Sequence, residues 1–277
     1  MLTGGGSLTQ PARVQKIAIE QLRDARRWTV PFPAVIDRDE TGICIDDLFA
    51  VKRGIATGAN DFFILDRTRA HDLGLPEEVL RPLLPKVRQL PTDEVAARSD
   101  GYPDLEPQLC LLDCDLSDSQ VRQRYPRLSD YLTSADGTGI RERNLVRHRR
   151  PWYRQEQREP APYLCTYMGR GQNGSPPLRF IWNRSKAVAT NTYLFLYPKA
   201  ALAELLQSDD TKARDVFELL KRASRDTMGT AWRTHAGGMH KIEPGDLRRV
   251  KLSSPPTWIT AAVQRVQPLL ATSPQLR

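Results

Sequence analysis

The chain has 277 residues, 40% of them hydrophobic, and a formal net charge of +8 at pH 7. This length can bury the core of one large domain or of two small ones. The longest apolar runs are only as long as strands, which excludes a membrane-spanning helix. The positive charge favours an acidic partner such as nucleic acid, although a basic enzyme satisfies the same balance.

The cysteines are far apart in the sequence, and no secretory leader precedes them. They are Cys44, Cys110, Cys114 and Cys165. We expect reduced thiols and a cytoplasmic protein. Because no C-x-x-C pair accompanies the histidines, the sequence predicts no metal site.

The N-terminal part differs in composition from the rest. Residues 1–12 are rich in glycine and threonine and are predicted to be a disordered lead-in. Residues 13–30 place apolar side chains, including Val14, Ile17 and Leu22, at helical spacing, which predicts a linker helix. Residues 31–277 are then expected to form one domain.

Strand-like runs dominate the first two thirds of that domain. The expected elements are a strand in 42–52, a strand-turn-strand hairpin over 53–65 around Gly54 and Gly58, a helix over 76–84, a strand over 109–114, a helix from Ser117, its N-cap, to Tyr131, and strands over 163–168, 180–182 and 191–197. After Pro198 the apolar spacing becomes helical, over 201–206 and 216–223. Strands followed by helices favour an α+β fold, with helices packed on a mixed or antiparallel sheet.

The highest density of charge lies in residues 141–158, which contain seven arginines together with Trp152 and Tyr153. Only Glu142 and Glu156 oppose them. Arginine binds phosphates with two donors, and aromatic rings stack on unpaired bases, so this composition is typical of a nucleic-acid surface. A solvated, ion-paired helix face with Trp152 in the core explains it equally well.

Several catalytic or cofactor motifs are absent or incomplete. Gly169, Gly171 and Gly174 have the dinucleotide-binding spacing, but Pro176 and Pro177 follow where a helix would have to begin, so we interpret them as a hairpin connection. The chain has neither a G-x-S-x-G elbow nor an acidic cluster that ends in acid-x-Lys. The sequence therefore offers no complete active site and no catalytic residue.

Six blocks together resemble the C-terminal, target-recognition half of N6-adenine DNA methyltransferases, most closely those of PstI- and BsuBI-type restriction-modification systems. The blocks are VKRGIATGANDFFIL (51–65), LRPLLP (80–85), RPWYRQEQR (150–158), TYMGR (166–170), RFIWNRSKAVATNTYLFLYPK (179–199) and GGMHKIEPGDL (237–247). They occur in the family's order, so the match is more specific than any one motif.

The resemblance implies a parent enzyme with two halves. The N-terminal half binds S-adenosylmethionine on a Rossmann-like sheet and has an Asn-Pro-Pro-Tyr motif, and neither feature occurs in this sequence. We therefore expect a target-recognition domain for double-stranded DNA, without the Rossmann-like catalytic domain. We expect no bound cofactor, and no methyl transfer unless a separate methyltransferase chain supplies the catalytic domain.

The candidate DNA contacts are polar and aromatic residues in loops and at strand ends. They are Arg53, Thr57 and Asn60, then Arg149, Arg150, Trp152, Tyr153 and Arg154, then Tyr167 and Arg170, then Asn183, Ser185 and Lys186, and finally His240 and Lys241. A purely structural role is the alternative for each of them. Two further functions stay open: a restriction-type nuclease with the same recognition domain, or a non-catalytic scaffold that pairs with a methyltransferase subunit through the helix in 13–30.

Overall fold

A five-stranded mixed sheet lies at the centre of the domain. The computed structural model describes residues 42–136, 138–171, 176–207, 209–226, 231, 233–235 and 238–270, with only the backbone described for 234 and 264–270. In order across this sheet the strands are β1 (Phe49–Arg53), β9 (Tyr193–Pro198), β6 (Tyr163–Thr166), β8 (Phe180–Asn183) and β4 (Glu94–Val95). Neighbouring strands are antiparallel except β4 and β8, which are parallel.

Both faces of the inner strands β6, β8 and β9 are buried, which explains why these strands are mostly apolar instead of alternating. Leu164 pairs with Ile181 and with Phe195, and all three belong to one hydrophobic cluster. Tyr163, the neighbour of Leu164 in β6, pairs with Trp182 and with Leu196. These three side chains face the other side of the sheet and belong to a second hydrophobic cluster.

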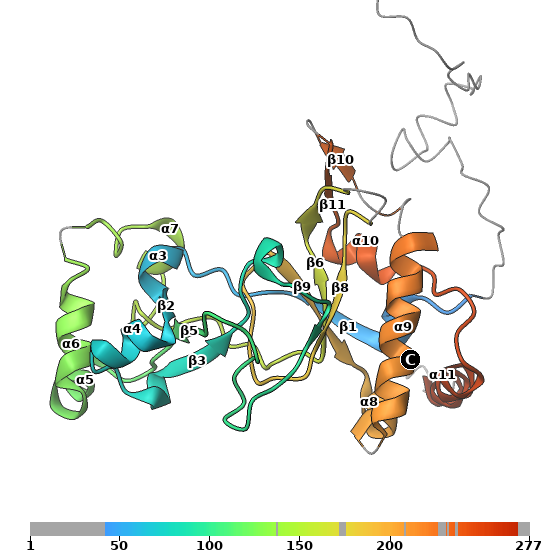
Figure 1. Ribbon diagram of the computed structural model, residues 1–277, viewed down its shortest axis with the longest axis horizontal. Helices are drawn as coiled ribbons and strands as arrows, with labels where there is room; N and C mark the ends of the chain where they lie inside the picture. Colours follow the sequence, from blue (N-terminus) through green and yellow to red (C-terminus); the bar gives the residue numbers. More distant parts are fainter. Residues whose placement is uncertain are drawn as a thin grey trace, which may run out of the picture. The chain divides into compact units, whose positions relative to one another are not determined.

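Helices cover the second face, and a small sheet lies near one end of it (Figure 1). These elements are α2 (Ile45–Leu48), α8 (Ala200–Gln207), α9 (Asp210–Asp226), α10 (Pro244–Arg248), α11 (Thr257–Leu270), and the three-stranded sheet of β10 (Arg233–His235), β11 (Met239–Lys241) and β7 (Met168–Gly169). Phe217 of α9 contacts the Trp182 ring of β8, with 5.7 Å between the ring centroids.

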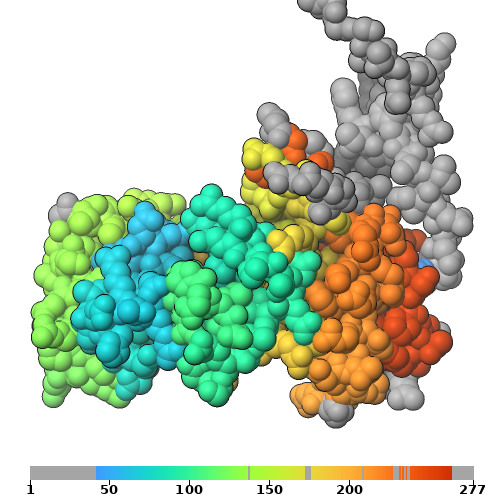
Figure 2. All heavy atoms as spheres, viewed as in Figure 1, coloured from blue at the N-terminus to red at the C-terminus, as the bar shows by residue number. Residues whose placement is uncertain are grey.

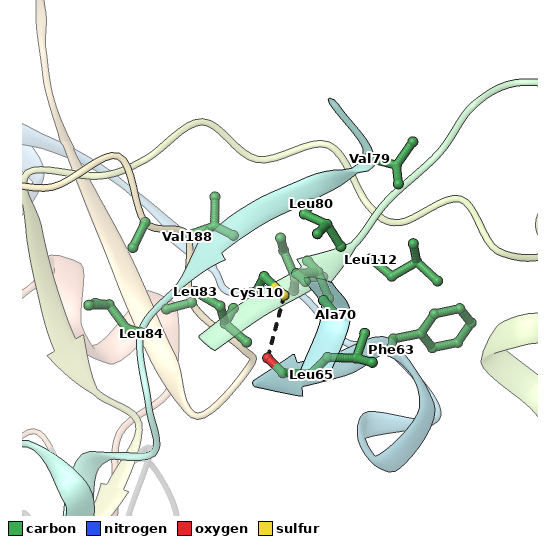
Figure 3. Close-up of a cluster of buried hydrophobic side chains, with 14 of the residues drawn as sticks. Phe63, Leu65, Ala70, Val79, Leu80, Leu83, Leu84, Cys110, Leu112 and Val188 are labelled. Carbon is green, nitrogen blue, oxygen red and sulfur yellow. Dashed lines mark hydrogen bonds between the residues drawn. The ribbon is translucent and has the colours of Figure 1, made fainter. Parts of the chain in front are cut away.

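A second three-stranded sheet and short helices build the other hydrophobic cluster. They are β2 (Ile64–Asp66), β5 (Leu109–Leu112), β3 (Leu80–Leu83), α3 (Asn60–Phe63), α4 (Arg67–Asp72), η1 (Glu77–Val79), η2 (Val87–Gln89), α5 (Asp118–Arg124), α6 (Pro126–Thr133) and α7 (Asn144–Arg147). Figure 3 shows Phe63, Leu83 and Leu112 around Cys110, whose thiol donates to the Leu65 carbonyl oxygen at 3.5 Å. Burial raises the pKa of the Cys110 thiol to about 12, so it is protonated at neutral pH.

The expected α+β class is confirmed, with a mixed sheet and packed helices. The Ser117 cap is also confirmed, since its hydroxyl accepts from the Gln120 amide. The helix that it begins ends at Arg124, and Pro126 starts α6, because proline has no amide to continue the first helix. All four cysteines are free, as expected.

The predicted hairpin over 53–65 is wrong. β1 pairs with β9, whereas β2 pairs with β5 in a different sheet. The chain leaves β1 at Gly54, where a Cβ atom would lie 2.3 Å from the Thr190 carbonyl oxygen. This close approach to a distant segment, and not a turn, is what requires glycine there.

Two other expectations are corrected or remain open. The helix expected over 76–84 is one 3-10 turn followed by β3, because pairing with β5 outweighs the helical pattern of this segment. Gly169 belongs to β7, but Gly174 lies outside the described residues, as do the lead-in over 1–12 and the linker helix over 13–30. No helix in the described ranges is long and apolar enough to span a membrane.

Candidate nucleic-acid interface

Residues 54–59 connect β1 to α3 and form the β1–α3 loop. The arginine-rich segment, residues 141–158, lies against this loop. Three arginines of that segment donate to carbonyl oxygens just before the loop, in its middle and near its end. The bonds are Arg158 Nε to Arg53 at 3.3 Å, Arg149 Nη2 to Ala56 at 2.6 Å, and Arg143 Nη1 to Gly58 at 3.3 Å. Two segments predicted separately from the sequence thus lie against each other, with the loop itself buried or partly buried.

Arg149 is the central contact between the loop and the arginine-rich segment. Its second nitrogen donates to Gln155 Oε1 at 3.0 Å, and its guanidinium lies 5.8 Å from the centre of the Phe63 ring. Partial burial lowers the pKa of this guanidinium, because desolvation disfavours the charged form. Since arginine nevertheless stays protonated, this is a fixed, partly desolvated charge beneath the loop.

Exposed arginines neighbour, in the sequence, the residues that contact the loop. Arg53, Arg147, Arg150 and Arg154 are all exposed. Within the described residues, the Arg154 side chain has neither a hydrogen bond nor an ion pair, so its charge is available to an external anion. The opposing Glu156 is already paired with Arg158. The surface therefore keeps an excess of positive charge.

Arg53, Tyr167 and Lys241, three of the predicted contacts, meet at one end of this surface. The Arg53 guanidinium lies 4.2 Å above the Tyr167 ring, and Lys241 Nζ lies 5.1 Å from the same ring. The Tyr167 hydroxyl donates to Glu243 Oε1 at 2.9 Å, and Lys241 pairs with that carboxylate at 2.8 Å. Both donors lower the pKa of Glu243, Lys241 more strongly.

At the other end, Thr57 holds the side chain of Asn60. The Thr57 hydroxyl accepts from the Ala59 amide at 3.2 Å and donates to Asn60 Oδ1. Thr57 is buried and Asn60 is exposed. A buried hydroxyl therefore orients an amide side chain that faces solvent.

Besides Thr57 and Tyr167, which are also buried, three predicted contacts are buried and hydrogen-bonded to the protein instead of facing solvent. The Tyr153 hydroxyl donates to the Leu116 carbonyl oxygen at 2.6 Å. Asn183 Nδ2 donates to the Ala161 and Ala187 carbonyl oxygens, and Asn183 Oδ1 accepts from Ser185 Oγ at 2.6 Å. We leave these three residues out of the candidate surface because their polar atoms are already satisfied by segments other than the β1–α3 loop.

The remaining predicted residues have mixed positions. Trp152 is partly buried against the Phe62 ring, at 5.7 Å between centroids, which agrees with a core role. The Lys186 side chain is exposed. Its backbone amide donates to the carbonyl oxygen of Gly101, a residue far from the β1–α3 loop in the sequence. His240 pairs across the sheet with Gly169, and Arg170 follows that strand directly.

Sequence reasoning missed Arg143, Arg158 and Glu243. The two arginines were visible only as members of a charged run, and nothing in the run indicates which side chains turn inward. Glu243 lies two residues after Lys241, beyond the end of β11, and opposite charges at this spacing are a weak signal for an ion pair. No cluster of three or more potential metal ligands occurs among the described residues.

A family model for the C-terminal domain of Type II methyltransferase M.Eco57I matches residues 34–274. The chain belongs to this family. The expected likeness to the C-terminal region of restriction-modification methyltransferases is thus confirmed at the level of the family, and the PstI or BsuBI type stays a prediction.

Two characterised relatives are similar over most of the chain. Type II methyltransferase M.XamI of Xanthomonas campestris pv. amaranthicola is 31% identical over 91% of this chain and 44% of its own length. Type II methyltransferase M.AccI of Acinetobacter calcoaceticus is 24% identical over 72% of this chain and 34% of its own length. The chain spans less than half the length of these relatives.

Two solved structures show a partial likeness. One is the type IIG restriction endonuclease BpuSI, with a TM-score of 0.43 and 14% identity over 83% of this chain and 27% of that one. The other is the type IIL restriction-modification enzyme MmeI in complex with DNA, with a TM-score of 0.37 and 11% identity over 84% of this chain and 29% of that one.

Proposed function

We propose that this M.Eco57I C-terminal-type domain is the DNA target-recognition part of an N6-adenine methyltransferase in a restriction-modification system. The domain binds duplex DNA through its cationic surface and reads bases with exposed residues on either side of the β1–α3 loop, such as Arg53 and Asn60. Family membership supports the methyltransferase context, and the six-block resemblance supports adenine and the PstI or BsuBI type.

The observation on which this proposal rests is the contact of the arginine-rich segment with the β1–α3 loop. Arg143, Arg149 and Arg158 are used to hold the loop, while Arg147, Arg150 and Arg154 of the same segment stay exposed. A loop fixed by internal hydrogen bonds and flanked by cations suits a reading element that phosphate contacts position on the duplex.

In this proposal, a region outside this chain carries out the methyl transfer. That region binds S-adenosylmethionine and receives the adenine after it has been flipped out of the helix, while the recognition domain sets the sequence at which this happens. It is either the other half of a longer enzyme or a separate chain. The system operates in the cytoplasm, together with the DNA.

A salt titration of duplex binding tests the phosphate contacts. We expect the logarithm of the binding constant to fall linearly with the logarithm of salt concentration, because bound cations release counterions. Arg154→Gln should weaken binding and reduce the slope by about 1, the contribution of roughly one phosphate contact. Arg88→Gln, at an exposed arginine in η2, is the matched control and should change neither quantity.

Three outcomes would contradict the proposal. Absence of duplex binding at low salt contradicts it outright, and equal slopes for Arg154→Gln and the wild type contradict the assigned surface. Cleavage of the duplex that requires Mg²⁺ would favour the nuclease alternative.

A further inference from the structure

We infer that Asn60 and Leu145 together recognise one A·T base pair, or two adjacent ones, in the major groove. Asn60 contacts the adenine edge and Leu145 contacts the methyl group of thymine. The inference rests on the proposed function and deepens it, because it assigns a base pair to two named side chains. Leu145 was not among the candidate residues from the sequence.

Asn60 has the geometry of a base-reading amide. Its Oδ1 already accepts the Thr57 hydroxyl, which fixes the plane of the amide and leaves one lone pair of that oxygen available. Among the described residues no group accepts from Asn60 Nδ2. An exposed asparagine with one acceptor site and its donors unused can bond an adenine at N6 and N7 simultaneously.

Leu145 is an apolar side chain in a cationic setting. It is 50% exposed, the highest value among the large hydrophobic side chains that the structure describes as exposed. The next residue of α7, Val146, is fully buried and anchors this short helix. In the sequence Leu145 is two residues before the exposed Arg147, and a phosphate contact of that arginine would bring a duplex close to α7.

Gly58 lets α7 approach the segment that leads into Asn60. A Cβ atom on Gly58 would lie 3.0 Å from Leu145 Cβ, and Asn60 follows two residues later in the chain. Figures 1 and 2 show α3, in blue, beside the yellow-green segment with α7. Gly58 has φ of +77°, so glycine is required both for the backbone and for the close approach of α7.

An A·T pair presents complementary groups to this combination. In the major groove it shows the N7 acceptor and N6 donor of adenine, and beside them the C5 methyl group of thymine. A G·C pair places an acceptor where Asn60 Oδ1 needs a donor, and it has no methyl group. The juxtaposition of an oriented amide with an exposed leucine therefore favours A·T.

In the first test, the wild type, Asn60→Ala and Asn60→Asp each select the duplexes that they bind from a randomised DNA library, and the selected duplexes are sequenced. The wild type should enrich a motif with an A·T pair, and Asn60→Ala should lose roughly tenfold or more of the discrimination at that position alone. Asn60→Asp keeps the acceptor for Thr57 but loses the amide donor, so its preference should move toward cytosine, whose N4 donates.

The second test replaces thymine by deoxyuridine in the selected site, which removes one methyl group. The wild type should bind the deoxyuridine site more weakly at one position, and Leu145→Ala should bind both sites equally. Leu73→Ala, at another exposed leucine that follows α4, is the matched control and should still discriminate. Urea unfolding of each variant checks that its fold is intact.

The outcomes separate this inference from the proposed function. If the wild type enriches a motif and both Asn60→Ala and Leu145→Ala enrich it with unchanged base preferences, the assignment is overturned while DNA recognition stands. If the selected motif contains no A·T pair, the assignment is also overturned. If the wild type binds duplex DNA but enriches nothing, both fail.

Discussion

Arg149 donates a hydrogen bond to the Ala56 carbonyl oxygen at 2.6 Å across 93 residues of sequence. Arg149 belongs to a basic segment whose composition is typical of DNA-binding surfaces, yet this contact gives it a structural role. It holds the β1–α3 loop, while other arginines of the segment are exposed. Charge in the segment is therefore divided between side chains that organise the protein and side chains that are available to a partner.

Arg149→Met should lower the free energy of unfolding by about 1–3 kcal/mol, because Ala56 and Gln155 lose their donor in a partly buried site. Urea denaturation measures the change. Arg154→Met, at an exposed arginine, should stay within about 0.5 kcal/mol of the wild type. Equal stability of the two variants would contradict the loop-holding role of Arg149.

Gly54→Ala should destabilise the domain by more than about 2 kcal/mol, because the new Cβ would overlap the Thr190 carbonyl oxygen. The matched control is Gly245→Ala in α10, where a Cβ meets nothing within 4 Å. That variant should be as stable as the wild type or slightly more stable. Thermal unfolding of the two variants checks the difference, and a Gly54→Ala protein of normal stability would refute the close approach.

Asn183→Ala tests whether this buried asparagine has a structural role. Loss of its bonds to Ala161 and Ala187 leaves buried carbonyl oxygens unpaired, so we expect a loss of about 1–3 kcal/mol in unfolding free energy. Affinity of the folded variant for duplex DNA should be unchanged. A stable variant with reduced affinity would restore Asn183 as a DNA contact.

The Glu243 carboxylate should make the domain sensitive to acid. Its pKa is lowered in the folded state, so its contribution to stability is complete above the usual value of about 4.3 and disappears as the pH falls through the folded value. The stability difference between wild type and Glu243→Gln should therefore shrink between neutral pH and about pH 3.5. Urea unfolding at both pH values measures it, and a difference independent of pH would contradict the ion pair with Lys241.

The sequence predicted local structure better than pairing. Ser117 was recognisable as a helix cap because capping depends on neighbouring residues. The hairpin over 53–65 failed because the partner of β1 is β9, about 140 residues later, and turn signals say nothing about so distant a strand. Gly54 suggested a turn, whereas it permits contact with Thr190.

The sequence predicted several residues of the candidate site, but not which of their side chains lie together or turn inward. Arg53, Tyr167 and Lys241 were chosen as separate loop residues, and the structure brings them together. Asn183 was chosen for its place at the end of a strand, where its side chain turns inward instead. Leu145 was overlooked because an exposed leucine can be recognised only once its burial is known.

The central claim is tested most directly when the wild-type chain selects duplexes from a randomised DNA library at two salt concentrations and the bound DNA is sequenced. The account predicts enrichment of one short motif that contains adenine, with base preferences that persist at the higher salt although overall affinity falls. Retention that disappears with salt and enriches no motif would contradict it, because the surface would then bind phosphates without reading sequence.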